Sequence, residues 1–302
     1  MIELKHIDKY YNIGTVNEVC LFKDFNLTVD DGDFISVIGS NGSGKTSMLN
    51  LICGSLEAEA GNIILNGEDI SHQKEYIRQR KIGRVYQNPA MGTCPSMTIL
   101  ENMSLADNKG KFFGLSSGIN KARKEYYREI LSQLGLGLEN KMDVKVGSLS
   151  GGQRQRIGIA RTLALNPQFI VCDEPVSALD VSIQAGVINL LEDLQNKLGV
   201  AYLFVAHNLS VVRHISSRIG VMYLGKLVEV APANELYQRP AHPYTRALLA
   251  AVPQPDPRIR NLEDATLRGD IPGPTSALPG CKFCSRCPHA MPVCQTQEPA
   301  MQ

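Results

Sequence analysis

The 302-residue sequence has no uninterrupted apolar run approaching the ~18 residues that a membrane-spanning helix needs. Its first residues, MIELKHIDKYY, also lack the apolar core of a secretory signal peptide. We therefore expect that no segment crosses a bilayer and that the chain resides in the cytosol.

A large excess of charge of either sign is missing too, because the formal net charge is +1. Nucleic-acid-binding proteins usually carry a strong excess of basic residues, so the composition does not indicate that this chain binds nucleic acid. With 43% hydrophobic residues, the chain can bury one large α/β domain with an appendage, or two domains.

The pattern of apolar residues predicts the order of the secondary structure. Short alternating runs over residues 1–35 predict antiparallel strands, and later apolar strands alternate with helices, which predicts a mostly parallel sheet covered on both faces. The later strands are expected at 34–38, 61–67, 82–87, 169–173 and 201–206, and helices at 121–136 and 182–198. The alternation of apolar strands and helices is interrupted by a polar segment near 104–122. Frequent prolines after about 232 predict a loop-rich tail.

The octapeptide GSNGSGKT satisfies the phosphate-loop pattern and stands between an expected strand and an expected helix. Its glycines allow successive backbone N–H groups to surround phosphates, Lys45 reaches the β- and γ-phosphates, and Thr46 ligates Mg²⁺. The residues expected to contact the nucleotide here are Gly39, Ser40, Asn41, Gly42, Ser43, Gly44, Lys45, Thr46 and Ser47.

Polar residues at the ends of other expected strands supply the remaining groups of a phosphate-hydrolysing site. Asp173 ends the run FIVCD and suits the metal, while Glu174 follows at once and could polarise the attacking water. His207, after LFVA, could reach the γ-phosphate, and Gln87 ends IGRVYQ. The alternatives are an ordinary acidic pair, a structural histidine and an unremarkable strand-end glutamine.

The stretch SLSGGQRQRIGIAR at 148–161 places two glycines ahead of a good helix-forming run. One interpretation is a loop with Ser150 as an ordinary N-cap. The other is that Gly151 and Gly152 let backbone N–H groups approach an anion closely at the helix start.

Together these motifs resemble the nucleotide-binding subunit of an ATP-binding cassette (ABC) transporter over roughly residues 1–230. The resemblance implies the α/β fold of a P-loop NTPase, with an antiparallel β subdomain and a helical subdomain at about 88–165. It implies a cassette at 1–232 followed by a loop-rich extension at 233–302. It also implies ATP and Mg²⁺ as cofactors, with the metal held through Thr46, Gln87 and Asp173.

The resemblance assigns further roles around the nucleotide. Glu174, His207 and Gln87 would be catalytic, Asp180 would be the D-loop residue, and Tyr11 would stack on adenine, with Tyr10 an alternative one residue away. In this family LSGGQ serves the ATP of the opposite subunit. The residues implied to close over that ATP are Ser150, Gly151, Gly152 and Gln153.

The same resemblance implies partners and a place in the cell. A second ABC ATPase subunit, identical or different, would pair head-to-tail, and a membrane permease would dock on the helical subdomain. A substrate-binding protein outside the cytoplasm would act indirectly. The chain would be peripheral, on the cytoplasmic face of the membrane.

The C-terminal part narrows the branch of the family. RPAHPYTRALLAAVPQPDP at 239–257, GDIPGP at 269–274 and the final cysteines resemble importer ATPases for dipeptides, oligopeptides or nickel. HPYT could also be a simple helix start at proline. The middle, 91–153, instead resembles a different branch of small importers. Di- or oligopeptide import is therefore expected, with amino-acid or nickel import as alternatives.

Non-transport members of the family fit the sequence less well. Translation factors usually carry two cassettes, whereas this sequence has one P-loop. Chromosome-structure ATPases insert a long coiled coil, for which the 128 positions between Lys45 and Asp173 leave no room. A binding module without hydrolysis would be expected to lack Glu174 or His207.

Four of the eight cysteines crowd near the C-terminus, in GCKFCSRCPHAMPVC. In a reducing compartment such spacing suggests metal ligands before disulfides. Cys281, Cys284, Cys287 and Cys294 could hold a [4Fe–4S] cluster, which the resemblance favours, or Zn²⁺. The alternative is four thiols without a metal.

Overall fold

The computed structural model describes residues 1–109, 111, 118–119, 121–251, 272–273 and 280–299. Most of the GDIPGP run and the PQPDP end of the preceding motif lie outside these residues. In the described part of the chain, no helix is long and apolar enough to cross a membrane.

A six-stranded sheet forms the centre of the molecule, in the order β10-β9-β3-β8-β7-β6. Its pairs are parallel except β9 with β10, as the alternation of strands and helices predicts. The strands are β3 (Phe34–Ile38), β6 (Ile82–Val85), β7 (Phe169–Asp173), β8 (Ala201–Val205), β9 (Arg218–Tyr223) and β10 (Lys226–Pro232).

The strands of this sheet other than the edge strand β10 are largely buried on both faces, and alternate residues enter different cores. In β8, Tyr202 and Phe204 join the core that includes most helices, while Leu203 and Val205 join the core under the antiparallel sheet. Burial on both sides explains why these strands are continuous apolar runs rather than half-polar ones.

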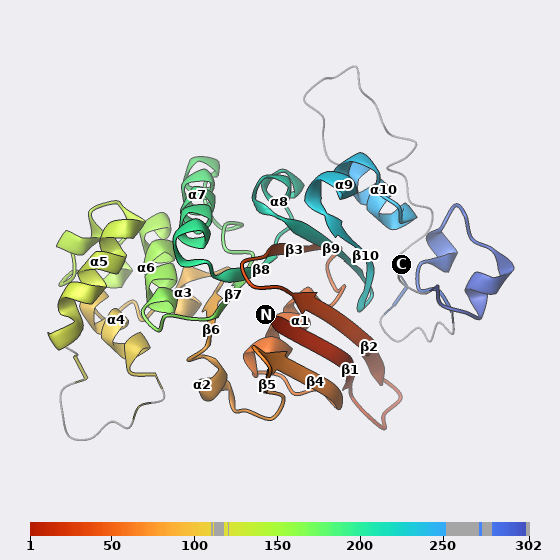
Figure 1. Ribbon diagram of the computed structural model, residues 1–302, viewed down its shortest axis with the longest axis horizontal. Helices are drawn as coiled ribbons and strands as arrows, with labels where there is room; N and C mark the ends of the chain where they lie inside the picture. Colours follow the sequence, from red (N-terminus) through yellow and green to blue (C-terminus); the bar gives the residue numbers. More distant parts are fainter. Residues whose placement is uncertain (110, 112–117, 120, 252–271, 274–279, 300–302) are drawn as a thin grey trace, which may run out of the picture.

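The antiparallel sheet has the order β2-β1-β4-β5. Its strands are β1 (Ile2–Tyr11), β2 (Val19–Val29), β4 (Ala60–Leu65) and β5 (Glu68–Asp69). The two runs EVCLF and FNLTV belong to one bulged strand, β2. Figure 1 shows this sheet beside α1 (Lys45–Cys53), below the strands of the central sheet.

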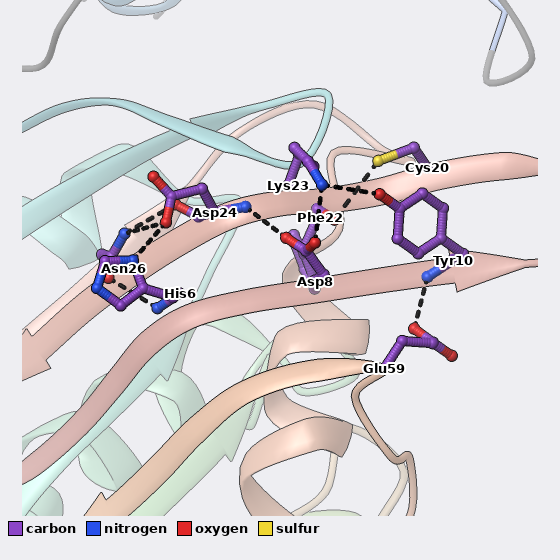
Figure 2. A network of polar contacts seen from close by, with 9 residues as sticks. All are labelled: His6, Asp8, Tyr10, Cys20, Phe22, Lys23, Asp24, Asn26 and Glu59. Carbon is purple, nitrogen blue, oxygen red and sulfur yellow. Dashed lines mark hydrogen bonds and ion pairs between the residues drawn. The ribbon is translucent and has the colours of Figure 1, made fainter.

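Polar contacts secure the irregular register between β1 and β2 (Figure 2). Asp8 accepts hydrogen bonds from the Asp24 backbone N–H at 2.7 Å and from Lys23 Nζ at 2.9 Å. Lys23 also donates to the Tyr10 hydroxyl at 3.2 Å. The backbone hydrogen bond is the main reason that the pKa of Asp8 is lowered. This network holds the Tyr10 ring beside Lys23.

Helices pack as a separate group beside β6 and β7 (Figure 1). The group comprises α3 (Pro89–Gly92), α4 (Ile99–Asp107), α5 (Lys124–Leu134) and α6 (Gly151–Leu163), and α7 (Val181–Leu198) joins it to the sheet. The polar segment expected from 104 overlaps the end of α4, which begins with a capping box of Thr98 and Glu101.

The expectation of a loop-rich tail is wrong for its first part. Within the tail, α9 (Ala233–Gln238) and α10 (Pro243–Ala250) lie near β9 and β10, and α8 (Leu209–Ile215) precedes the tail. Pro243 begins α10 rather than breaking it, because the first helical position needs no backbone N–H, and His242 caps that helix through Nδ1. HPYT therefore begins a helix, which is compatible with either interpretation of this stretch.

Candidate functional site

The phosphate loop joins β3 to α1 and is shaped by close backbone approaches. Gly44 precedes α1 with a φ of 106°, a conformation that favours glycine. A Cβ at Gly39 would collide with the backbone carbonyl oxygen of Met222 in β9. These glycines allow the loop to lie flat against its neighbours, with its backbone N–H groups gathered at the start of α1.

Lys45 folds back over this loop. Its Nζ donates to the carbonyl oxygens of Gly39 at 2.8 Å and Ser40 at 2.9 Å. Burial lowers the pKa of Lys45, against the opposing attraction of Glu174 and Asp173. The ammonium thus lies in a partly desolvated site where its interaction with an anion is stronger than in water.

A cavity of about 200 Å³ lies over the loop. Ser40, in the loop but not among the lining residues, has a buried hydroxyl oxygen without a hydrogen-bond partner. A polar cavity with cationic, hydroxyl and backbone N–H groups fits a phosphate chain. The cavity is lined by Leu21, Asn41, Gly42, Gly44, Lys45, Thr46, Ser47, Glu174 and His207.

Glu174 and His207 meet at this cavity from neighbouring strand ends. Glu174 follows β7, His207 follows β8, and Nε2 of the histidine lies 2.6 Å from Oε1 of the glutamate. Glu174 has a φ of 46°, which is uncommon for a side chain other than glycine and is a form of strain found at functional sites. The pair can therefore hold a proton acceptor beside the phosphate loop.

Asp173 has a partner that the sequence analysis missed. Arg84 in β6 places a guanidinium nitrogen 3.3 Å from Asp173 Oδ2, and both side chains are largely buried. The two residues lie on paired parallel strands, β6 and β7. Nothing in the local sequence around Arg84 marks it, because the contact depends on strand order.

The remaining predicted residues lie around the cavity without lining it. Tyr11 places its hydroxyl 3.3 Å from Ser47 Oγ at the start of α1, whereas Tyr10 faces Lys23. Tyr11, not Tyr10, thus borders the loop. Gln87 and Asp180 are exposed.

The LSGGQ stretch at 149–153, here called the signature loop, leads into α6, and its capping agrees with the N-cap interpretation. Ser150 caps the helix by accepting from the Gln153 N–H, and Gln153 accepts from the Ser150 N–H at 3.1 Å. A Cβ at Gly152 would lie 2.6 Å from Ile183 Cγ2 in α7, so this glycine is needed for helix packing. At Gly151 the nearest atom would be Leu179 Cδ2 at 3.8 Å, which leaves room for a side chain.

The four C-terminal cysteines do not form the expected metal site. Among the described residues, which include all four, no three His, Cys, Asp or Glu side chains are grouped to hold a metal. Cys281 and Cys287 instead pack against the core around buried Phe283. Burial raises the pKa of Cys281, which disfavours the thiolate that a metal would need.

The strand, glycine-rich loop, helix and strand-end carboxylates define a P-loop ATPase. Residues 22–177 match the ABC transporter family, and residues 228–294 match the oligopeptide/dipeptide transporter C-terminal region. The chain belongs to the ABC transporter family as an ATP-hydrolysing subunit, with the P-loop NTPase fold that the sequence predicted.

Relatives cover the chain from end to end, including the middle region. One relative is a protein of Brucella ovis that is named as a peptide import ATP-binding protein. It is 41% identical over 100% of this chain and 94% of its own length. The oligopeptide transport ATP-binding protein AppF of Bacillus subtilis is 39% identical over 99% of this chain and 92% of its own.

A solved structure agrees with the fold. The dimeric ATP-binding cassette MJ0796 bound to ADP and Pi has a TM-score of 0.66 and 32% sequence identity. It covers 77% of this chain, and 99% of its own length is matched.

Proposed function

We propose that this chain energises the import of di- or oligopeptides through a membrane permease. The observation that carries the proposal is an ATPase cassette joined to the C-terminal region at 228–294, together with relatives named for peptide transport over their nearly full length. Amino-acid or nickel import remains the alternative.

In the proposed hydrolysis, backbone N–H groups of the loop and Lys45 bind the β- and γ-phosphates. Thr46 and Asp173 offer the oxygen ligands that Mg²⁺ prefers, and the ion would neutralise charge on the phosphates. Glu174 accepts a proton from the attacking water, and His207, 2.6 Å away, orients that carboxylate and faces the γ-phosphate. Tyr11 stacks on adenine, beside Ser47.

The partner contacts belong to the same proposal. Ser150, Gly151, Gly152 and Gln153 would close over ATP bound by a second subunit, and Asp180 would be the D-loop residue. Gln87 would link the permease contact to the γ-phosphate. The permease would dock on the helices that follow Gln87. Large apolar side chains are exposed there, because Met91 in α3 is 71% exposed and Met97, before α4, is 37% exposed. The chain would then be peripheral to the membrane, on its cytoplasmic face.

Loss of the gene should abolish growth of an auxotroph on peptides that supply its required amino acid, while free amino acid and nickel uptake stay normal. Wild-type chain should restore growth, and Met91→Glu should not, although its ATPase activity in isolation persists. Met291→Glu is the matched control, since Met291 is 59% exposed on the C-terminal segment.

Labelled-peptide uptake would measure each case. A selective defect in amino-acid or nickel uptake would show that this solute, and not a peptide, is the transported substrate. Loss of uptake in Met291→Glu with normal uptake in Met91→Glu would move the permease contact to the C-terminal segment.

A metal in the cysteine segment, residues 280–294, is not part of the proposed function, because the described residues contain no group of three His, Cys, Asp or Glu side chains placed to hold one. Anaerobically purified protein should therefore be colourless and contain no stoichiometric iron or zinc by metal analysis. A brown chromophore would restore the iron–sulfur expectation, and stoichiometric zinc without colour would restore the zinc alternative.

A further inference from the structure

The C-terminal extension touches the ATP site at one backbone group of the phosphate loop. Tyr244, in α10, accepts a hydrogen bond from the Ser40 N–H through its hydroxyl at 2.8 Å. The two residues are 204 positions apart, and the Tyr244 side chain is buried. Neither residue is among those that line the cavity over the loop.

Ser40 also binds the side chain of Lys45 through its backbone carbonyl oxygen. The Ser40 carbonyl oxygen accepts from Lys45 Nζ at 2.9 Å, while the Ser40 N–H is bound by Tyr244. The tyrosine therefore fixes the same short piece of backbone that fixes the phosphate-binding ammonium. Without the hydroxyl, the Ser40 N–H would lose its partner and this part of the loop would be less restrained.

Aromatic rings of β9 and of the extension hold Tyr244 in place. Its ring centroid lies 4.7 Å from that of Tyr223 in β9 and 5.7 Å from that of Phe283 in the cysteine segment. Phe283 meets Tyr223 edge-on at 5.2 Å and is 1% exposed. Contacts of this kind contribute beyond simple area burial and restrict the rings to one arrangement.

A second contact joins the cysteine segment to the loop through the β9–β10 turn. Lys282 Nζ donates to the Leu224 carbonyl oxygen at 2.6 Å, and the Gly225 N–H donates to the Ser43 carbonyl oxygen at 2.7 Å. A Cβ at Gly225 would collide with the Leu21 backbone, so the turn is tightly fitted. The cysteine segment therefore supports the phosphate loop at two residues. It reaches Ser40 through Phe283 and Tyr244, and it reaches Ser43 through the β9–β10 turn.

We propose that Tyr244 is a positioning residue of the ATP site, through which the C-terminal extension holds the phosphate loop in its nucleotide-binding conformation. Pre-organising a loop raises affinity by reducing the ordering that binding must otherwise supply. The hydroxyl should thus act on ATP affinity rather than on the chemical step. The proposal concerns the ATP site and does not depend on which solute is transported.

The test is Tyr244→Phe in the full chain, which keeps the ring and removes the hydroxyl. The dissociation constant for ATP and the KM should rise about 3- to 10-fold, as the loss of one hydrogen bond predicts, while kcat at saturating ATP stays unchanged. Tyr223→Phe is the matched control, because it removes a hydroxyl that is buried in the same cluster and has no hydrogen-bond partner. It should bind ATP like wild type.

Two further measurements separate positioning from simple stability. Amide hydrogen exchange of the 39–44 peptide, without nucleotide, should be faster in Tyr244→Phe than in wild type or Tyr223→Phe. Phe283→Ala should shift the ATP affinity in the same direction. A lowered melting temperature with unchanged ATP affinity and loop exchange in Tyr244→Phe would overturn the proposal. Unchanged affinity in Phe283→Ala would remove the cysteine segment from it.

Discussion

Replacing Glu174 by glutamine should lower ATP turnover on the order of 10²–10⁴-fold while ATP binding persists, because an amide cannot accept the proton of the attacking water. The change keeps the size of a side chain that lies 2.6 Å from His207 and lines the cavity over the phosphate loop. The variant should accumulate as an ATP-bound dimer on size exclusion, and phosphate release would measure turnover.

The chain offers a matched control for this substitution. Glu192 in α7 also pairs with a histidine, at 3.7 Å from His214 Nε2, but it does not line the cavity. Glu192→Gln should leave turnover unchanged, since it alters a Glu–His pair without touching the site. Near-normal hydrolysis by Glu174→Gln would disprove the assignment of Glu174 as the proton acceptor.

The phosphate loop could be predicted from the sequence because its information is local. One octapeptide supplies the glycines, Lys45 and Thr46, and its flanks supply the strand and helix that orient them. Asp173, Glu174 and His207 could be found as well, since each follows an apolar run. Parallel strands end at one edge of the sheet, so residues that follow them meet there.

Contacts between distant segments left no such local sign. Arg84 reaches Asp173 only because β6 pairs with β7, and Tyr244 reaches Ser40 only after β9 and α10 have packed. The cysteine spacing suggested ligands, yet partly buried Cys281 and Cys287 pack against the core that contains Phe283. Tertiary packing therefore decided the points on which spacing alone was ambiguous or misleading.

Two helices that the sequence analysis did not predict, α4 and α10, begin at recognisable helix-start residues. The capping box of Thr98 and Glu101 marks the start of α4, whose end overlaps the segment described as polar from 104. The prolines of the tail suggested loops, whereas Pro243 occupies the first turn of α10, where proline is favoured. Local rules for helix starts were thus more informative than the overall frequency of proline.

The two roles of the signature loop can be separated by its adjacent glycines. Gly151 has room for a side chain, and an acidic residue in the first turn of a helix does not oppose the helix dipole. Gly151→Asp should therefore fold normally and yet repel the γ-phosphate bound by a second subunit. Gly152→Ala should instead lower the melting temperature, because the new methyl group would press on Ile183 at 2.6 Å.

Mixing two inactive variants would show whether the signature loop acts across a dimer. Lys45→Met disables the phosphate loop and Gly151→Asp disables the signature loop, so each variant alone should have almost no ATPase activity. In a head-to-tail dimer, a mixed pair would hold one intact site, built from Lys45 of one subunit and Gly151 of the other. Equal mixing should restore up to about a quarter of wild-type activity, because about half of the dimers would be mixed.

Steady-state phosphate release from the mixture, against each variant alone, is the measurement. Wild-type specific activity should also rise with protein concentration if the chain pairs with itself. Mixtures as inactive as the single variants, in protein whose wild-type form shows that concentration dependence, would place Gly151 and Lys45 in the same site of one subunit. Wild-type activity that never depends on concentration would instead indicate pairing with a different ATPase subunit. With that subunit, Lys45→Met should disable one of the two ATP sites and Gly151→Asp the other, so each variant should keep one intact site.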